Sequence, residues 1–380
     1  MLKGIYVTLL VGPTVPVPVP QVVVDALTGV QVTVAAGQRS GFQLTFTLSN
    51  DSPLQTAFLL MAGQVPLLRT IIILTINSIP NVLMDGVITQ TQVTPGGKPG
   101  QSTLTVTGED LTKVMDLQDF SGIPYPAMPA EARIALIIAK YAIFGMIPLV
   151  IPSLFMDIPI PVDRIPTHQG SDLKYVEQLA SQVGYVFYVE AGPLPGTNTA
   201  YWGPEIKFGV PQPALNFDMD AYTNVEALSF SYKTTEYSIP IVFIQNQLTH
   251  VPIPIPIPPI NPLQPPLGAI PPLPTNLLPP DLTPFGDDLA KKPIPQAIMQ
   301  GLARAAQNAE AVSCDGSLDV TRYRGVLQAR QLVGVRGAGT AFDGLYYVKS
   351  VTHKIKRGEY KQDFALSRNG LVSTVSTVNL

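Results

Sequence analysis

Two runs of residues near the C-terminus decide the fold: F-D-G-L-Y-Y-V-K-S-V-T-H-K-I at 342–355 and G-E-Y-K-Q-D-F-A-L at 358–366. β-Branched and aromatic side chains dominate both runs, and such side chains suit a pleated, half-buried surface. The pattern predicts strands at 345–356 and 360–366, and a shorter strand at 331–335 before a cluster of glycines. Together the three strands form an antiparallel meander.

The link between the last two predicted strands is short. Gly358, in the link 357–359, can adopt the positive φ that a tight hairpin requires. After the link, Tyr360, Phe364 and Leu366 alternate with polar or small residues, which predicts one apolar face.

Three further runs accompany the meander: G-E-D-L at 108–111, Q-G-S-D-L-K-Y-V-E-Q-L-A at 169–180 and G-Y-V-F-Y-V-E at 184–190. In their order and spacing, these runs and the meander resemble the late-control protein D family of phage tail hub proteins. That family is related to the hub part of type VI secretion VgrG proteins. The resemblance covers most of the chain apart from a proline-rich section.

The resemblance implies a fold and a role. Three hub chains form a ring whose six barrel domains match the six-fold inner tube, and the ring joins that tube to a three-fold spike. This chain stops at Leu380 without an oligonucleotide-fold domain or a β-helix needle, so a separate spike protein is expected. The expected partners are two further copies in a homotrimer, the inner tube protein, the spike protein and other baseplate subunits.

The chain carries few charges. Only 13% of its 380 residues are charged and the formal net charge is -3, which does not favour nucleic acid as a partner. So low a charge content suggests that other subunits cover much of the surface. Cys314 is the one cysteine and excludes an internal disulfide. No transmembrane span is predicted, because the apolar run at 134–155 contains Lys140 and two prolines and its uncharged part is too short.

The predicted elements give a β-rich α+β fold with two barrel-like β domains, a small α/β domain and a proline-rich insertion. Residues 1–120 form the first barrel-like domain. Its strands are predicted at 4–11, 22–27, 30–35, 41–48, 71–76, 82–93 and 102–108, with a short helix at 54–61.

Residues 121–207 form the small α/β middle domain. Helices are predicted at 129–144 and at 171–181, the second capped by Ser171 or Asp172 and ended by Gly184. A strand follows at 185–190. The second barrel-like domain comprises 208–246 and 316–380, with early strands at 225–233 and 239–245. Residues 247–315, which include a predicted helix at 295–311, interrupt it.

A proline-rich strap, residues 251–284, opens with V-P-I-P-I-P-I-P-P-I. Its prolines exclude both a helix and an interior strand. The strap has no charged residue before 281, so its exposed side chains would form a large apolar patch. We expect Ile253, Ile255 and Ile257 to contact an adjacent hub subunit or another baseplate protein; the alternative is a strap folded back on its own barrel.

No catalytic, cofactor or metal site is predicted. The three histidines, His168, His250 and His353, are isolated, and His353 is interpreted as a half-buried strand residue with a local hydrogen bond. Two carboxylate pairs, Glu109 with Asp110 and Asp172 with Glu177, could serve a glycoside hydrolase only if they lie close together. Helix capping is the preferred interpretation of the first pair.

The C-terminal hairpin region has a concentration of basic residues: Lys349, Lys354, Lys356, Arg357, Lys361 and Arg368. A solvated strand face is one interpretation of this cluster. A positive wall that faces a lumen or an acidic neighbouring subunit is the other.

The favoured function is a structural baseplate hub of a contractile tail or injection system, not an enzyme. It would be assembled in the cytoplasm as part of a phage tail or tail-like particle. The alternatives are a carbohydrate-binding or adhesive β protein, for which Trp202 is the sole tryptophan, and a cell-wall hydrolase of the tail tip. Phage, extracellular and type VI-like systems are not distinguished by these motifs.

Overall fold

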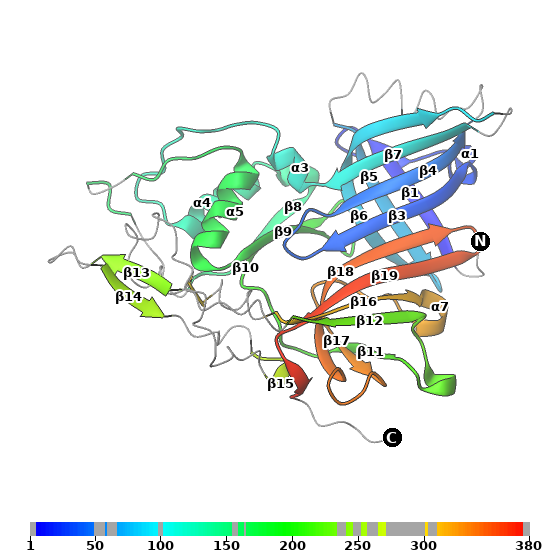
Figure 1. The fold of residues 1–380 in the computed structure, drawn as a ribbon. Coiled ribbons are helices and arrows are strands. Elements are labelled where there is room, and N and C mark those ends of the chain that lie inside the picture. Colours follow the sequence, from blue (N-terminus) through cyan, green and yellow to red (C-terminus); the bar gives the residue numbers. More distant parts are fainter. Residues whose placement is uncertain are drawn as a thin grey trace.

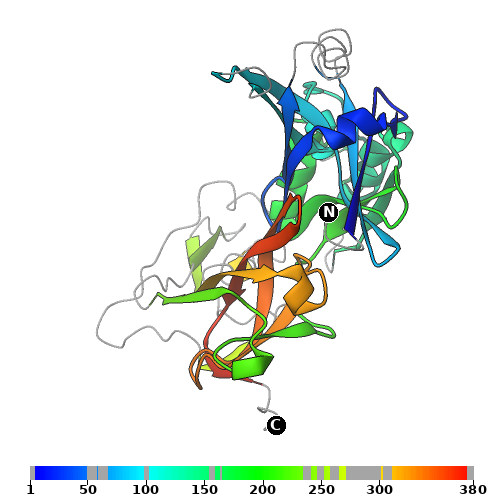
Figure 2. The ribbon, with the colours of Figure 1, turned by 90° about the vertical axis from the view of Figure 1, so that its right-hand side faces the viewer.

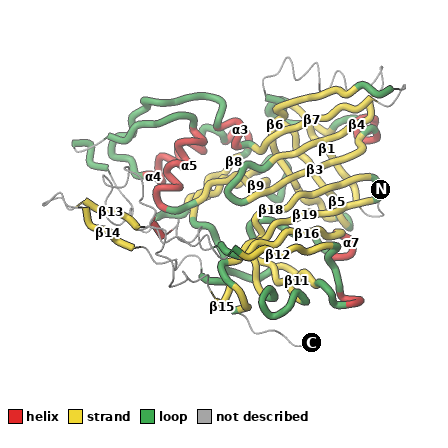
Figure 3. The backbone as a smooth tube through the Cα atoms, in the orientation of Figure 1, coloured by secondary structure: helices red, strands yellow, loops and turns green. Residues whose placement is uncertain are grey.

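The computed structural model describes residues 5–48, 58, 67–97, 102–153, 159–162, 165–233, 241–245, 252–256, 265–270, 301–302 and 310–374. The described chain has two β-rich halves and a small unit of helices and strands beside them (Figure 1). Strands dominate both halves, and helices gather in the third unit (Figure 3). The β-rich α+β class is confirmed.

One sheet of 13 strands, antiparallel except for the β11–β17 pair, runs through both halves. The first half contributes β3 (Leu27–Ala35), β4 (Gly41–Leu48), β7 (Ser102–Asp110), β6 (Ile79–Thr94), β5 (Arg69–Ile76), β1 (Ile5–Gly12) and β2 (Val17–Pro18), in this spatial order. The second half contributes β12 (Ala227–Tyr232), β16 (Val312–Asp319), β19 (Glu359–Arg368) and β18 (Gly344–Lys356). β17 (Leu332–Arg336) pairs with β18 and, in parallel, with β11 (Gln212–Asn216).

The two halves join where β18 pairs with β3. The ladder runs from Ser350 opposite Ala35 to Lys356 opposite Gly29. Side chains add to it, since the hydroxyls of Thr33 and Thr352 lie 3.0 Å apart although 319 residues separate them in the chain. In Figure 2 the C-terminal hairpin reaches from the second half to the first. The β-strands therefore form one structure across the junction.

The predicted C-terminal meander is confirmed. β17, β18 and β19 pair antiparallel in sequence order, and Gly358 between the last two has a φ of 83°. Tyr360, Phe364 and Leu366 are buried, as their alternation predicted. They belong to one hydrophobic core that continues into the first half through β4 side chains such as Leu44.

Two predictions about the first half need correction. The described strand pairings do not close a barrel, because β1 pairs only with β5 and with two residues of β2. A strand predicted at 22–27 is instead the helix α1 (Gln21–Asp25), followed by the start of β3. The β-branched run suggested a strand, but Val22 is 62% exposed and Val23 alone is buried there. After β2 the chain must reverse to enter β3, and one helical turn begun at Pro20 does so.

The α/β unit has a sheet in the order β8 (Met146–Val150), β10 (Asn198–Gly203), β9 (Val186–Ala191). Its helices are α4 (Ala130–Ala139), the short η2 (Ala142–Phe144) and α5 (Asp172–Val183), with α3 (Thr112–Met115) linking it to β7. The predicted caps of α5 are confirmed: Ser171 accepts a hydrogen bond from the Lys174 amide, and Gly184 is left-handed with a φ of 72°.

The strap is described only in part. Its residues Pro252–Pro256 form β14, which pairs antiparallel with β13 (Ile241–Gln245) in a separate sheet. Prolines lack the N–H, so Ile253 and Ile255 supply the backbone donors of β14, consistent with the exclusion of an interior strand. β15 (Gly268–Ile270) pairs with β20 (Leu371–Ser373). Ile257, the helix predicted at 54–61 apart from residue 58 and the helix at 295–311 apart from 301–302 and 310–311 lie outside the described residues.

Candidate assembly site at the sheet junction

The β18–β19 hairpin carries all four predicted interaction lysines, and three of them lie near its tip. Lys354 and Lys356 are exposed on β18 and alternate with the buried His353 and Ile355. Lys361 on β19 lies directly opposite Lys354. Residues that face each other across a ladder share one side of the sheet. The three lysines therefore project from the same outward face, beside the junction with β3.

Acidic side chains neutralise most of this charge. Lys354 forms an ion pair with Asp363, and Lys361 Nζ lies 2.9 Å from a Glu226 oxygen and 3.4 Å from a Glu359 oxygen. Exposed pairs of this kind contribute about 0–1 kcal/mol to stability. Their main effect is on the electrostatic pattern of the surface, which is mixed and not uniformly positive.

Two of the predicted basic residues, Lys349 and Arg368, lie apart from the outward face that carries Lys354, Lys356 and Lys361, which we call the hairpin face. Lys349 lies in the β18 bulge, between Val348 and Ser350, and forms an ion pair with Glu310. Arg368 is only 1% exposed, and its guanidinium donates hydrogen bonds of 2.7 and 2.8 Å to the carbonyls of Ala341 and Asp343. Burial lowers the pKa of Arg368. It is a structural residue that satisfies loop carbonyls, so the interpretation of Arg368 as part of the surface charge was wrong.

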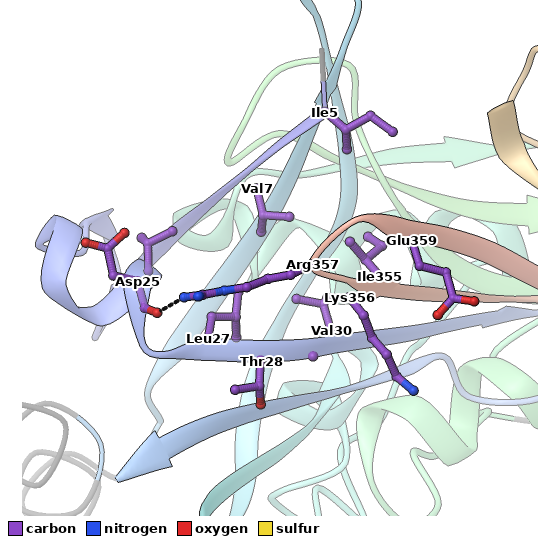
Figure 4. Close-up of a pocket in the computed structure, with 12 residues that line it drawn as sticks. Ile5, Val7, Asp25, Leu27, Thr28, Val30, Ile355, Lys356, Arg357 and Glu359 are labelled. Carbon is purple, nitrogen blue, oxygen red and sulfur yellow. Dashed lines mark hydrogen bonds between the residues drawn. The ribbon is translucent and has the colours of Figure 1, made fainter. Parts of the chain in front are cut away.

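A pocket of about 280 Å³ lies at the tip of the hairpin, between β1, α1 and the start of β3. Figure 4 shows its apolar side chains and the charged groups around them. Arg357, in the turn, donates a hydrogen bond to the backbone carbonyl of Asp25 and so ties the hairpin to α1. Among the residues the structure describes, Lys356 has no ion-pair partner. The pocket is lined by Ile5, Val7, Val24, Asp25, Leu27, Thr28, Gly29, Val30, Ile355, Lys356, Arg357 and Glu359.

A second pocket, of about 320 Å³, lies where the two halves meet the α/β unit. Arg330 spans it: its Nη2 donates to the Ala35 carbonyl at 2.8 Å, and its guanidinium carbon lies 3.9 Å from the centre of the Tyr188 ring. Arg330 also has a left-handed φ of 65°, which is uncommon for a non-glycine residue. This arginine therefore connects β3, β9 and the loop before β17.

His353 lines the same pocket but is a core residue. It is 5% exposed, and its Nδ1 lies 2.8 Å from the Tyr360 hydroxyl and 3.3 Å from the Gln362 amide nitrogen. Burial lowers the pKa of His353 to about 4, so the ring is neutral at pH 7. The local hydrogen bond is confirmed, although the side chain is fully and not half buried.

Three of the four carboxylates considered for hydrolysis have structural partners. Glu109 pairs with Arg39 at 3.3 Å, whereas Asp110 accepts hydrogen bonds from the amides of Thr112 and Ser40. The Thr112 bond satisfies an amide at the start of α3, as the capping interpretation predicted. The Asp172 carboxylate accepts hydrogen bonds from the side chains of Lys140 and Tyr141. Within the described ranges, no three histidine, cysteine or acidic side chains are grouped to hold a metal ion.

Solved structures share this architecture along almost the whole chain. A tail protein from Neisseria meningitidis superimposes with a TM-score of 0.63 at 14% identity, covering 97% of this chain and 98% of that one. This is a tail-protein fold. A 43 kDa tail protein of prophage MuSo2 from Shewanella oneidensis superimposes with a TM-score of 0.62 at 13% identity, covering 96% of this chain and 98% of that one. An Escherichia coli type VI secretion component, described as similar to T4 bacteriophage tail proteins, superimposes with a TM-score of 0.53 at 10% identity. The match covers 92% of this chain and 76% of that one.

The resemblance to tail proteins and type VI components, predicted from short motifs, is thus confirmed at the level of fold. No protein-family model matches the chain, and no curated protein does. None of the described helices is long and apolar enough to cross a membrane.

Among the described residues is a buried charge pair, Arg69 with Asp85, that the sequence analysis missed. Arg69 begins β5 and Asp85 lies in β6, and both side chains are buried. The sequence signal for this pair is one charged residue in each of two strands that have apolar runs. A buried charge costs free energy unless it is paired, so two such residues are expected to pair. This pair lies where the first half meets the α/β unit.

Proposed function

We propose that this chain is a structural baseplate hub: a homotrimeric adaptor between a hexameric inner tube and a separate trimeric spike. The observation that carries the proposal is the full-length match to tail proteins, in which the overall architecture persists at 14% identity. Persistence of a whole architecture at that identity fits a role in which shape determines function.

The sheet supports the arrangement of such a ring. Each chain has two β-rich halves on one continuous sheet, so three chains would present six β-rich surfaces towards a six-fold tube. The domain limits that we propose are 1–120 for the first half, 121–207 for the α/β unit, and 208–246 with 312–380 for the second, because β16 begins at Val312 and not at the predicted 316. Residues 247–311 are the insertion.

We further propose that the hairpin face is an assembly surface. Lys354, Lys356 and Lys361 stand out from the sheet at the junction of the two halves, and Arg357 anchors the turn to α1. Lys354 and Lys361 already have acidic partners within the chain, so Lys356 is the cation that would attract an acidic neighbouring subunit and help to fix register. The particle would assemble in the cytoplasm and form part of a phage tail or tail-like apparatus.

The rival functions have less support. A glycan-binding protein needs exposed aromatic platforms. The sole tryptophan, Trp202, is completely buried, whereas the smaller aromatics Tyr6, Phe208 and Tyr222 are exposed. A hydrolase needs free carboxylates around a cleft. Here Glu109 forms an ion pair with an arginine, Asp110 accepts a backbone hydrogen bond, and Asp172 accepts hydrogen bonds from a lysine and a tyrosine.

Native mass spectrometry of the purified chain, alone and with its tube and spike proteins, tests the hub proposal. A trimer that binds both proteins is the expected result. A chain that stays monomeric with both present would refute it. A monomer that binds glycan arrays would instead support the adhesive alternative.

A further inference from the structure

The pocket of about 320 Å³ between the two halves and the α/β unit has the lining of a small-molecule site, and we call it the inter-unit pocket. The first half lines it with apolar side chains that include Val34, Val82 and Met84. The α/β unit contributes residues 189–193, and the second half contributes residues 326–330 and His353. Ligand pockets usually have volumes of about 300–1,000 Å³ and hold a few polar groups that orient the ligand.

One such polar group is the imidazole of His353, whose tautomer is fixed by its neighbours. Leu327 orients Gln362: the side-chain oxygen of Gln362 accepts from the Leu327 amide, and its side-chain nitrogen donates to the Leu327 carbonyl, both at 2.9 Å. That nitrogen also lies 3.3 Å from His353 Nδ1, so its second N–H donates to Nδ1. Because the ring is neutral at pH 7, its own proton is on Nε2.

The Nε2–H group of His353 has no acceptor among the residues that the structure describes, although the side chain is only 5% exposed. Leaving a buried donor unpaired costs about 1–3 kcal/mol. Tyr360 and Gln362 occupy the Nδ1 side of the ring, and His353 lines the inter-unit pocket. A ligand in this pocket can therefore supply the acceptor that Nε2–H lacks.

Arg330 adds unused donors to the same pocket. Its Nη2 donates to the Ala35 carbonyl at 2.8 Å, but its buried Nε has no acceptor. Contact with the Tyr188 ring holds the guanidinium in place. Its positive charge favours a carboxylate as the ligand group, because hydrogen bonds between charged partners are roughly twice as strong as neutral ones.

Three carboxylates line the pocket and limit the charge that a ligand can carry. Asp85 is paired with Arg69, and both oxygens of Asp110 already accept hydrogen bonds. Glu190 is exposed and has no ion-pair partner in the described part of the chain. A single carboxylate on the ligand would use the free donors, whereas a second negative charge would be repelled by Asp110 and Glu190.

We propose that the inter-unit pocket binds a small monocarboxylic acid with an aliphatic chain. Its carboxylate accepts hydrogen bonds from His353 Nε2 and Arg330, and its chain contacts Val34, Val82 and Met84. All three units then touch one ligand, so binding stabilises their arrangement by mass action. This site goes beyond the proposed hub function and does not depend on the oligomeric state.

Saturation-transfer NMR on the purified full-length chain, with butyrate as the probe, tests the proposal. Butyrate has few atoms, so the expected dissociation constant is on the order of 1 mM. Succinate, with a second carboxylate, and n-butylamine, with none, should bind at least about tenfold more weakly. Arg330→Met should weaken butyrate binding at least about tenfold, because a charge-assisted hydrogen bond is lost. Arg336→Met, at the exposed end of β17, is the matched control and should bind butyrate like the wild type.

Three results would overturn the proposal: no saturation transfer to butyrate in the wild-type chain, equal binding of the three probes, or unchanged butyrate binding by Arg330→Met. Thermal melting checks that each variant is folded. If Arg330→Met does not fold, His353→Phe takes its place with the same expected loss, since it keeps an aromatic ring and removes Nε2–H. Native mass spectrometry reports trimer formation separately, so failure of this site and failure of the hub proposal are distinguishable.

Discussion

Arg69 and Asp85 form a two-pronged ion pair in the interior, with Nε and Nη2 of Arg69 at 2.8 and 2.6 Å from the two carboxylate oxygens. The arginine side chain also donates to the carbonyls of Thr14, Phe144 and Gly196. Phe144 and Gly196 belong to the α/β unit, so one arginine on β5 connects that unit to the first half. These carbonyls and Asp85 together give each of the three guanidinium nitrogens a hydrogen-bond acceptor, which stabilises the buried charge.

Replacing Arg69 by methionine should destabilise the protein by about 3–5 kcal/mol, because Asp85 would remain buried without its cation. Urea denaturation followed by tryptophan fluorescence is suitable, since Trp202 lies in the α/β core. Arg39→Met is the matched control: Arg39 also holds two acids but its side chain is 39% exposed, and the expected loss is about 1 kcal/mol or less. Equal losses in the two variants would contradict the assignment.

Stability should decline in mild acid because of His353. Burial depresses its folded-state pKa from 6.5 to about 4, so between these values the unfolded chain binds a proton that the folded chain does not. Stability from this residue is therefore complete above about pH 6.5 and falls as the pH drops towards 4, by about 3 kcal/mol in all. His353→Gln keeps a polar partner for Tyr360 and should flatten that part of the curve. An unchanged pH profile in the variant would show that other groups govern the decline.

Gly358→Ala should destabilise the hairpin by about 1 kcal/mol. A Cβ there meets no atom within 4 Å, so the cost comes from the left-handed backbone alone. Gly29→Ala is the control on the neighbouring strand, where the added Cβ would only touch the Thr45 side chain at 3.9 Å. Thermal melting of both variants measures the difference. A neutral Gly358→Ala would mean that the turn relaxes to another conformation.

Charge reversal at Lys356 should affect assembly and leave folding almost unchanged. Lys356→Glu removes an exposed cation that has no ion-pair partner within the described residues, and it places a like charge opposite Glu359 in the ladder, so the expected loss of stability is no more than about 1 kcal/mol. Binding to an acidic neighbouring subunit should weaken, and the loss should shrink at high salt. Co-sedimentation with the inner tube protein at two salt concentrations measures this. Lys113→Glu, on α3, is the charge-matched control, and equal binding by both variants would argue against the hairpin face.

Local features were predictable from the sequence because their causes are local. The hairpin at Gly358, the Ser171 cap and the Gly184 terminus depend on residues within a few positions of each other. The placement of α1 was not predictable in this way. Val22 and its neighbours favour a strand, but a strand requires a partner, and that choice depends on distant parts of the chain.

Whether a charged side chain is buried or exposed also depends on contacts with residues that are distant in the sequence. Arg368 looked like its exposed basic neighbours in the sequence, yet the carbonyls that hold it come from a loop about 25 residues earlier. Arg69 begins the apolar strand β5 and Asp85 lies within β6, and these two charges could have been used as a signal. Alternation identifies the buried face of a strand, but it does not identify the strand that will lie next to it.

The pairing of β3 with β18 has a consequence for biosynthesis. At about 5–20 residues per second, a ribosome needs on the order of 16–60 s to add the 319 residues that separate Thr33 from Thr352. During that interval the growing chain displays β3 as an edge strand with unsatisfied N–H and C=O groups. Nascent chains on neighbouring ribosomes carry the same bare edge. Synthesis speed and chaperone capture, and not only the final free energy, therefore set the yield of correctly paired subunits.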